Sequence, residues 1–265
     1  MKAEMIEKVL KIAFEAGKII LDVYQRAEIA VEEKADNSPV TEADLRSSAY
    51  IVEQLEQQFP YPVVSEERPI DYQERKGWDK FWLVDPLDGT KNFIHRDGQF
   101  TINIALIHGD KPVVGVVYVP LGNIAYFAEE GEGAYKQEHA QTVKIWNDRN
   151  TDDLISATSV FHDSPASKQF CDVFGIKHSL KFGSAVKLCK LAEGEIDVYP
   201  RFVGTKEWDT AAAHCIAMEA NCKVIDIVTK RELVYNKERV KNNCFIASRN
   251  NLDFIGDRRL ALVRI

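Results

Sequence analysis

The sequence lacks the features that would place it outside ordinary globular proteins: it has few cysteines and no long hydrophobic run. Only five of its 265 residues are cysteines, an odd number without a Cys-x-x-Cys pair. We therefore expect no disulfide framework and no zinc site, but buried thiols in a reducing compartment. No stretch of eighteen apolar residues occurs, and the segment Met1–Glu7 carries scattered charges. We therefore expect no membrane-spanning helix and no signal peptide, and we predict a cytoplasmic location. Peripheral attachment to the inner membrane stays open.

An excess of basic charge is also missing. The chain has 34 Lys and Arg residues against 41 Asp and Glu residues, which gives a formal charge of −7. General binding to nucleic-acid polymers or to an anionic membrane surface calls for the opposite sign. The length is sufficient for a sizeable core without disulfide bonds, either as one large unit or as two lobes.

Two amphipathic helices are predicted in the first sixty residues. Apolar residues recur with helical spacing from Ile6 to Tyr24, and a polar break follows at residues 35–39. A second helix is expected to begin at Thr41, because Asp44 stands three residues later as in a capping box. Its buried stripe is predicted to comprise Leu45, Ala49, Val52, Leu55 and Phe59.

The remaining chain divides into two patterns. Short apolar or alternating runs at residues 63–65, 81–84, 100–107, 113–119 and 124–127 predict a mostly antiparallel sheet beside the early helices. After about residue 150, strands and helices alternate, which predicts a second sheet covered by helices. Strands are expected at residues 154–160, 180–182, 196–199, 224–227 and 244–247, and helices at 166–174, 184–192 and 210–222. The chain is thus predicted to be an α/β protein with tightly packed lobes at residues 1–150 and 151–265.

Carboxylates stand where the predicted structure changes abruptly. Asp85 ends an apolar strand, and Asp88 follows three residues later across a Pro-Leu dipeptide. Two carboxylates and a carbonyl on one tight turn suit a hard cation such as Mg²⁺. Gly89 and Thr90 then begin a short helix, whose free N–H groups could hold an anion beside the cation. A plain turn and an ordinary helix N-cap would also explain this pattern.

Two further acidic positions carry the same ambiguity. Glu66 and Glu67 follow a short strand, where such a pair is usually solvated. Asp209 precedes a run of small residues and could simply cap a helix. Each position alone says little about function.

The two segments together resemble the signatures of the inositol monophosphatase superfamily. Residues Trp82–Phe93 (WLVDPLDGTKNF) are similar to the first signature, and Trp208–Ala212 (WDTAA), about 120 residues later, to the second. The resemblance extends from about Ser38 to about Ser248. The pair of signatures in this order is highly specific.

Within this superfamily the chain is most similar to the bacterial 3′(2′),5′-bisphosphate nucleotidases of the CysQ type. Lys91, the strand Gln99–Ile107, and the segments Gly183–Lys187 and Asp197–Arg201 carry that similarity. Asn92 departs from it, since this branch more often has Glu there and the inositol branch has Asn. An inositol or sugar monophosphatase therefore remains the alternative.

The resemblance implies a layered αβαβα sugar-phosphatase-like fold and two or three Mg²⁺ ions per site. The implied metal ligands are Glu66, Asp85, the Leu87 carbonyl, Asp88 and Asp209. The implied catalytic residues, which orient or deprotonate water, are Thr90 with Asp44 or Glu67, although Asp44 could merely cap its helix. The implied substrate-binding residues are Glu66, Leu87, Asp88, Gly89, Thr90, Ser184, Lys187, Arg201 and Asp209.

The function that follows is a Mg²⁺-dependent phosphatase that removes the 3′-phosphate of adenosine 3′,5′-bisphosphate by metal-activated water. The expected partner is this small phosphorylated nucleotide, with sulfur assimilation as a setting, lithium sensitivity expected and a homodimer left open. A non-catalytic nucleotide or cation sensor is the alternative from another class. No adenine-contacting residue can be chosen, since core packing explains Phe182, Tyr199 and Phe202 equally well. His95 and His214 are expected to be surface or packing residues.

Overall fold

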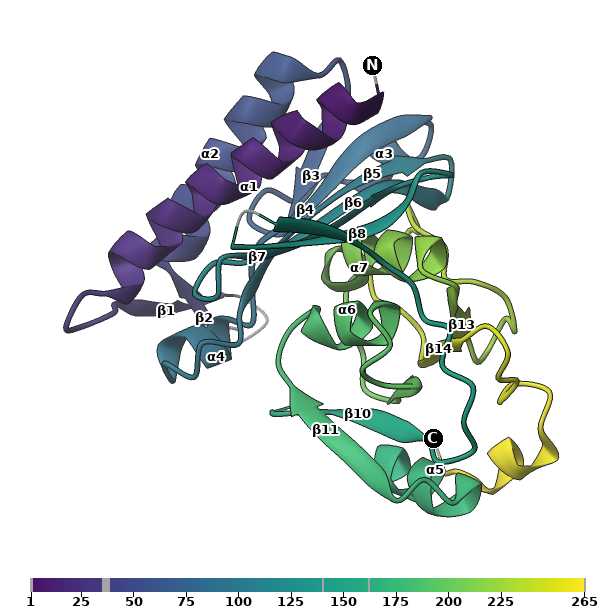
Figure 1. Ribbon diagram of the computed structural model, residues 1–265. Coiled ribbons are helices and arrows are strands. Elements are labelled where there is room, and N and C mark those ends of the chain that lie inside the picture. Colours follow the sequence, from purple (N-terminus) through teal and green to yellow (C-terminus); the bar gives the residue numbers. More distant parts are fainter. Residues whose placement is uncertain (1, 35–38, 140, 162, 265) are drawn as a thin grey trace.

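The computed structural model describes residues 2–34, 39–139, 141–161 and 163–264, and it has five alternating layers (Figure 1). Helices α1 (Lys2–Tyr24) and α2 (Glu42–Gln58) cover one face of a seven-stranded sheet. Helices α6 (Val186–Ala192) and α7 (Glu207–Glu219) lie between this sheet and a five-stranded one. Helix α5 (Pro165–Phe174) packs on the far side of the second sheet. The predicted αβαβα layering is confirmed.

The first sheet is the predicted antiparallel meander, with one parallel pair at its edge. Its strand order follows the chain from β3 to β9. Among the described strands of this sheet, only the pair of β3 and β4 is parallel. The strands are β3 (Val63–Ser65), β4 (Lys80–Asp88), β5 (Thr101–His108), β6 (Lys111–Val119), β7 (Ile124–Glu129), β8 (Gly133–Glu138) and β9 (Gln141–Ile145).

The second sheet is mixed, as the alternation of strands and helices predicts. Its order is β11-β10-β12-β14-β13, with β10 parallel to both of its neighbours and β14 antiparallel to both of its own. The strands are β10 (Ile155–Ser159), β11 (His178–Phe182), β12 (Val198–Arg201), β13 (Cys222–Asp226) and β14 (Phe245–Arg249). Several short elements were not predicted, among them β1 (Val31–Glu33), β2 (Pro39–Thr41), α3 (Tyr72–Arg75), strand β9 and the 3₁₀ helix η1 (Arg258–Leu262).

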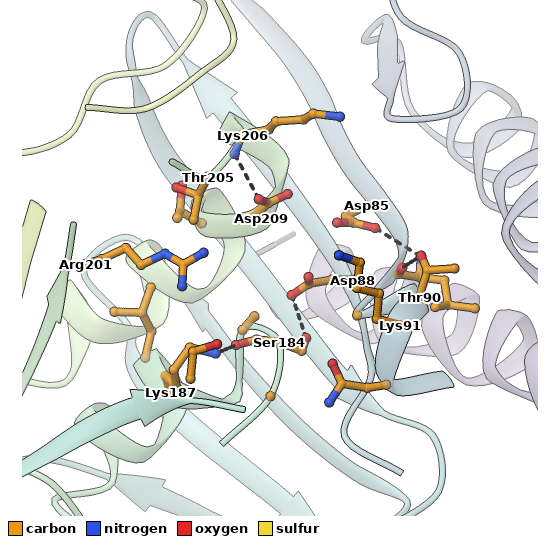
Figure 2. A pocket seen from close by; sticks show the side chains of 18 of the residues that line it. Asp85, Asp88, Thr90, Lys91, Ser184, Lys187, Arg201, Thr205, Lys206 and Asp209 are labelled. Carbon is orange, nitrogen blue, oxygen red and sulfur yellow. Dashed lines mark hydrogen bonds between the residues drawn. The ribbon is translucent and has the colours of Figure 1, made fainter. Parts of the chain in front are cut away.

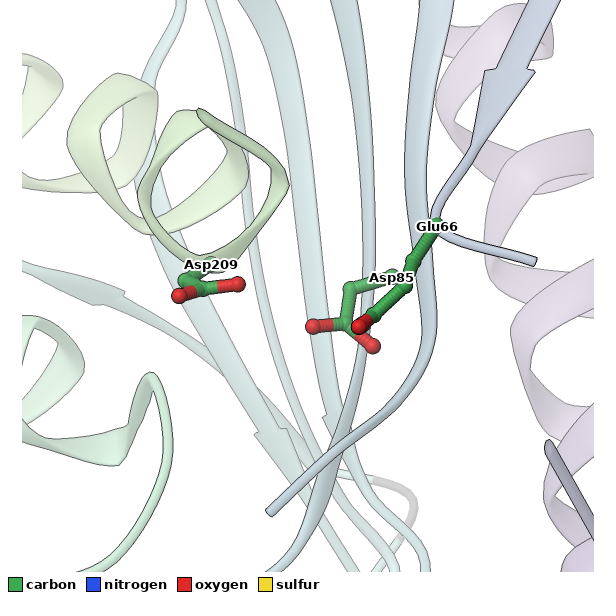
Figure 3. A group of neighbouring side chains, drawn as sticks. All are labelled: Glu66, Asp85 and Asp209. Atoms are coloured by element: carbon green, nitrogen blue, oxygen red, sulfur yellow. The ribbon is translucent and has the colours of Figure 1, made fainter. Parts of the chain in front are cut away.

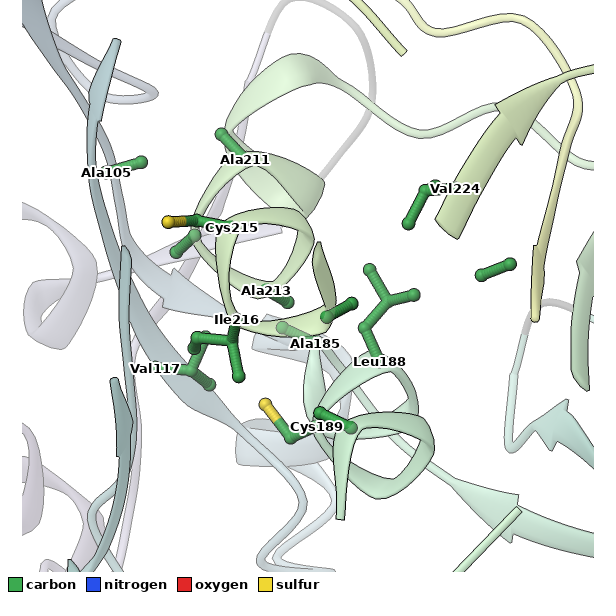
Figure 4. Close-up of a cluster of buried hydrophobic side chains, with 14 of the residues drawn as sticks. Ala105, Val117, Ala185, Leu188, Cys189, Ala211, Ala213, Cys215, Ile216 and Val224 are labelled. Carbon is green, nitrogen blue, oxygen red and sulfur yellow. The ribbon is translucent and has the colours of Figure 1, made fainter. Parts of the chain in front are cut away.

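The two sheets come from opposite sides of the proposed lobe boundary near residue 150, yet one core joins them. Helix α7 packs so closely on β6 that a Cβ atom on Gly115 would lie 2.2 Å from the Ala212 carbonyl oxygen. Glycine is therefore required at this contact (Figure 4 shows the surrounding core). In the described part of the chain, no helix is long and apolar enough to cross a bilayer.

Helix α2 begins as predicted, but its buried face differs from the predicted stripe. Thr41 is the N-cap, and its N–H and hydroxyl donate to the Asp44 carboxylate over 2.8 and 2.6 Å. Leu45 is 49% exposed, and Ala49 is exposed as well. Polar residues such as Ser47 take the buried positions because each finds a hydrogen-bond partner, here the Ala43 carbonyl at 2.6 Å. Of the predicted polar break at residues 35–39, residues 35–38 lie outside the described residues, and Pro39 begins β2.

Strand β4 does not end at Asp85, as the sequence suggested, but continues to Asp88 through a bulge. The register with β5 shifts between these two residues. Pro86, which has no N–H to donate, sits at this irregularity, where a ladder hydrogen bond is not needed. The Leu87 N–H donates instead to the Asp85 carboxylate over 3.1 Å. The bulge thus turns consecutive parts of one strand toward the same space.

Candidate active site

A pocket of about 400 Å³ lies where the two sheets and helix α7 meet, and it gathers the residues of both signatures (Figure 2). The ends of β3 and β4 form one wall together with the first turn of α4 (Thr90–Ile94). The start of α6, strand β12 and the start of α7 form the opposite wall. All the predicted metal and substrate-binding residues line it: Glu66, Asp85, Leu87, Asp88, Gly89, Thr90, Ser184, Lys187, Arg201 and Asp209.

Three carboxylates from three elements converge at the centre of this pocket (Figure 3). One oxygen each of Glu66, Asp85 and Asp209 lies within 4.8 Å of the other two. Glu66 follows β3, and its N–H donates to the Val84 carbonyl of β4 over 3.0 Å, which fixes its place beside Asp85. Asp209 accepts the Lys206 N–H at 2.9 Å, so it caps α7 and faces the pocket at once.

Asp88 stands on the same wall but outside this close group of three. Its carboxylate accepts the Ser184 hydroxyl at 2.5 Å and the Asn103 amide at 3.4 Å. Ser184 has a positive φ of 51°, a backbone conformation that aims its hydroxyl from the second half of the chain toward β4. Asp88 is thus tied to the wall that carries the basic residues.

The carboxylates raise one another's pKa values. Burial, followed by repulsion from Glu66 and Asp88, raises the pKa of Asp85 well above its ordinary value. Burial and then Asp88 and Glu66 raise the pKa of Asp209 to about 8. Full ionisation of this group therefore needs a compensating charge. An all-oxygen donor set that includes a strand-end carbonyl fits Mg²⁺.

Two lysines place ammonium groups against one of these carboxylates, that of Glu66, a feature that was not predicted from the sequence. Lys34 Nζ lies 3.1 Å from Glu66 Oε1 and also bonds Glu67, while Lys206 Nζ lies 3.4 Å from Glu66 Oε1. Neither lysine belongs to a signature, and both lie far from Glu66 in sequence. Only the fold brings these cations together with the acidic group.

The Asp44 carboxylate caps its helix and also contacts a residue that lines the pocket. One of its oxygens caps α2, while the other accepts the Thr90 hydroxyl at 3.1 Å. The same hydroxyl lies 3.3 Å from the Leu87 carbonyl oxygen. Asp44 is buried, and burial raises its pKa against the opposing effect of its hydrogen bonds to Thr41 and Thr90. The cap therefore holds a carboxylate in contact with a pocket residue.

Glu67, the other predicted catalytic carboxylate, is placed differently. It lines a separate hollow beside α2 rather than the pocket, and it reaches Glu66 through the shared partner Lys34. Burial raises its pKa. Thr90 lines the pocket and Asp44 contacts Thr90, whereas Glu67 does not line the pocket.

The opposite wall, which carries Asp209, also holds two basic residues (Figure 2). Lys187 is buried, and its ammonium donates to the Ser184 carbonyl over 2.6 Å and to the Phe182 carbonyl over 3.2 Å. Desolvation lowers the pKa of Lys187 to about 7, although Asp88 opposes the shift. Arg201, on β12, is also buried and points into the same pocket. Two basic groups thus face the acidic cluster across one cavity.

Asn242 supports the wall that carries Asp209 and was not identified from the sequence. Its side-chain amide donates to the Thr205 hydroxyl, the Lys206 carbonyl and the Thr210 hydroxyl over 3.1, 3.0 and 3.0 Å. Thr205, Lys206 and Thr210 all line the pocket. Asn242 lies in a stretch without regular structure, so no periodicity or motif could have marked it.

Comparison with known proteins finds relatives over most of the chain. The Inositol monophosphatase family matches residues 1–255. The Escherichia coli (strain K12) 3′(2′),5′-bisphosphate nucleotidase CysQ is 42% identical over 224 residues, covering 84% of this chain and 90% of the relative. The Haemophilus influenzae protein of the same name is 37% identical over 231 residues, with 84% of each chain covered.

Solved structures give the same result. The crystal structure of CysQ from Bacteroides thetaiotaomicron superposes with a TM-score of 0.84 at 39% identity, over 93% of this chain and 97% of the other. The Thermotoga maritima IMPase, at 24% identity, shares the fold with a TM-score of 0.78 over 99% of this chain and 97% of its own. The chain belongs to the inositol monophosphatase family.

Proposed function

We propose that this chain is a Mg²⁺-dependent phosphatase that hydrolyses the 3′-phosphate of adenosine 3′,5′-bisphosphate to give AMP and phosphate. One observation carries the proposal: a cluster of carboxylates faces two buried basic residues across a single pocket. The acidic side suits a phosphate held through cations, and the basic side suits a second phosphate held directly. Relatives named as 3′(2′),5′-bisphosphate nucleotidases, 42% identical in Escherichia coli, support the same substrate.

The carboxylate cluster is the reaction side in this proposal. Glu66, Asp85 and Asp209 would hold Mg²⁺, together with Asp88 and the Leu87 carbonyl, and we expect two or three ions. When bound, Mg²⁺ acidifies a coordinated water and offsets the charge that develops on the phosphate. The number of ions and the preference for Mg²⁺ are part of the proposal.

The residues of the chain itself orient the reactants. Thr90 hydrogen-bonds to Asp44 over 3.1 Å, so its hydroxyl can align the attacking water while Asp44 accepts the proton. The raised pKa of Asp44 favours that acceptance. The Gly89 and Thr90 amides at the start of α4 bind phosphate oxygens. The water oxygen then displaces the 3′-oxygen in line, without a covalent enzyme intermediate.

The second phosphate and the sugar bind Ser184, Lys187 and Arg201. Desolvation lowers the pKa of Lys187 to about 7, and the negative charge of a bound phosphate favours its protonated form. Arg201 offers a planar fork to the same group. Glu67, which lies behind the pocket, would act indirectly by holding Lys34.

A substrate panel tests the proposal. Phosphate release is measured with Mg²⁺ from adenosine 3′,5′-bisphosphate and from inositol 1-phosphate at matched concentrations. We expect kcat/KM to favour the nucleotide at least tenfold, about 1.4 kcal/mol in transition-state binding. The reverse preference would establish the inositol or sugar monophosphatase alternative. Asn92 matches the residue that the inositol branch has at this position. No turnover of either compound, with nucleotide still bound, would favour a sensor.

Replacing Lys187 with methionine tests the second-phosphate site. We expect KM for the bisphosphate nucleotide to rise about 10- to 100-fold, because a charge-assisted hydrogen bond contributes about 1.5–3 kcal/mol. KM for inositol 1-phosphate should stay within about twofold. The matched control is Lys190→Met on the same helix, whose ammonium pairs with Glu193 and Glu195 instead of facing the pocket. Equal effects on both substrates would contradict this assignment.

A further inference from the structure

A buried arginine outside the pocket joins the segment that follows Glu66 to the loop that precedes β14. Arg75, at the end of α3, is only 3% exposed. Its Nε donates to the Ile70 carbonyl over 3.2 Å, and its two Nη groups donate to Asn236 Oδ1 and the Lys237 carbonyl, each over 2.7 Å. The Asn236 side-chain amide donates in return to the Arg75 carbonyl over 3.0 Å. These bonds close two segments onto each other that are 161 residues apart in the sequence.

A buried glutamate binds the same loop. Glu207 lies in the first turn of α7, two residues before Asp209, and is 1% exposed. Its carboxylate accepts the backbone N–H groups of Asn236 and Lys237, each over 2.9 Å, and Lys237 Nζ lies 2.8 Å from it. The loop of residues 233–242, hereafter the strap, is thus bound both to α3 and to the start of α7.

The first turn of α7 depends on such contacts because its N-cap residue is a lysine. The Lys206 ammonium cannot accept a hydrogen bond from the free N–H groups of this turn. Asp209 accepts the Lys206 N–H at 2.9 Å, but the same carboxylate faces the pocket. The strap adds a backbone bond, in which the Glu207 N–H donates to the Val240 carbonyl over 2.8 Å. The strap therefore supplies ties that the N-cap side chain does not.

The need for packing alone does not explain two buried charges at this place. Burial of a charged group is unfavourable even when it is hydrogen-bonded, and apolar residues of similar volume often give equal or higher stability. Neither Arg75 nor Glu207 lines the pocket. The two charges supply a defined backbone geometry, because a hydrogen bond prescribes a distance and an angle that an apolar contact does not. The segments fixed in this way carry Glu66 and Asp209, two of the three carboxylates of the cluster.

We propose that Arg75 is a positioning residue of the cation site, which sets the separation of the Glu66 and Asp209 carboxylates through the strap. The inference rests on the proposed function, in which these carboxylates hold Mg²⁺. Mg²⁺ demands near-ideal octahedral geometry with ligands at about 2.0–2.1 Å, so a small displacement of one carboxylate weakens binding. Groups that orient metal ligands from outside the coordination shell typically contribute about 10- to 100-fold in metal affinity. Arg75 acts through the strap, so we expect the lower end of this range.

The test is calorimetric titration of metal-free Arg75→Met with Mg²⁺, which does not rely on turnover. We expect the dissociation constant of Mg²⁺ to rise about tenfold. In phosphate release from adenosine 3′,5′-bisphosphate, the half-saturating Mg²⁺ concentration should rise by the same factor. KM for the nucleotide at saturating Mg²⁺ should change less than twofold, because Ser184, Lys187 and Arg201 are untouched.

Asn236→Gly is a milder variant that keeps the buried arginine. Asn236 has a φ of 64°, which glycine adopts freely, and the substitution removes only the side chain that bonds Arg75. We expect the Mg²⁺ dissociation constant to rise in the same direction by a smaller factor. If circular dichroism shows that Arg75→Met does not fold, Asn236→Gly decides the question.

The matched control is Arg249→Met, which removes another buried arginine that binds backbone carbonyls. Arg249 is 2% exposed, and its guanidinium donates to the Arg149 and Thr151 carbonyls over 2.7 and 2.6 Å. It does not line the pocket. Arg249→Met should therefore lose stability in thermal unfolding but keep the wild-type dissociation constant for Mg²⁺.

Two results would overturn the positioning role while leaving the proposed function standing. One is a wild-type Mg²⁺ dissociation constant in Arg75→Met or in Asn236→Gly. The other is an equal rise in Arg249→Met, which would mean that the loss of any buried arginine weakens the site. Wild-type protein that neither binds Mg²⁺ nor needs it for turnover would instead overturn the proposed function, and the positioning role with it.

Discussion

Phosphate release by the Asp85→Asn variant is expected to fall at least about a thousandfold, a loss of about 4 kcal/mol in transition-state stabilisation. Asp85 is buried at the centre of the carboxylate group, where an amide can neither carry the charge nor bind a divalent cation as well. The measurement is initial-rate phosphate release from adenosine 3′,5′-bisphosphate at saturating Mg²⁺, with circular dichroism to verify the fold. Asp209→Asn should behave similarly.

The control is Asp79→Asn, since the Asp79 side chain is 78% exposed and lies outside the pocket lining. It should keep wild-type activity. Asp85→Asn should also unfold at a higher temperature than the wild type in metal-free buffer, because it removes repulsion with Glu66, Asp88 and Asp209. Activity close to wild type in Asp85→Asn would contradict the metal assignment, and a lowered unfolding temperature would contradict the electrostatic account.

Local patterns were sufficient to predict most of the fold. Helix α1 and the meander have strong periodicity, and the capping box of α2 is a short-range signal that the structure reproduces atom by atom. The burial of α2 was predicted less well. Hydrophobicity alone favoured Leu45, whereas the inward positions are taken by Asp44 and Ser47, whose polar groups are hydrogen-bonded. A buried capping carboxylate thus displaced the expected apolar stripe.

The candidate site could be assembled from the sequence only with the help of family resemblance. Composition and spacing left Glu66 as a solvated residue and Asp209 as a helix cap. The structure shows why both descriptions were incomplete: the cap and the pocket use the same Asp209 carboxylate. Lys34 and Asn242 contact the site from distant segments of the chain, and no local pattern marks such contacts.

The metal-free protein is expected to lose stability as the pH rises from about 4 to about 8. Burial and neighbouring carboxylates raise the pKa of Asp209 to about 8, above the value of about 3.9 for an unfolded Asp. A group whose pKa is higher in the folded state binds its proton more tightly there. Its stabilising contribution is therefore complete below about pH 4 and is lost as the pH rises through the folded pKa. Asp85 and Asp88, with pKa values raised in the same direction, add to this slope.

Divalent cations should remove this loss, since they bind the ionised carboxylates of the folded state. Thermal unfolding is measured with EDTA and with Mg²⁺ at pH 5.5 and at pH 8. We expect the Mg²⁺-induced rise in unfolding temperature to be larger at pH 8, where the ligands release their protons more easily. At one hundred times the dissociation constant, a single ion adds about 2.7 kcal/mol. Asp209→Asn should show a weaker pH dependence in EDTA and a smaller response to Mg²⁺. A Mg²⁺ effect that is equal at both pH values would mean that these carboxylates do not form the cation site, because a site made of ligands with raised pKa values must bind its metal in competition with protons.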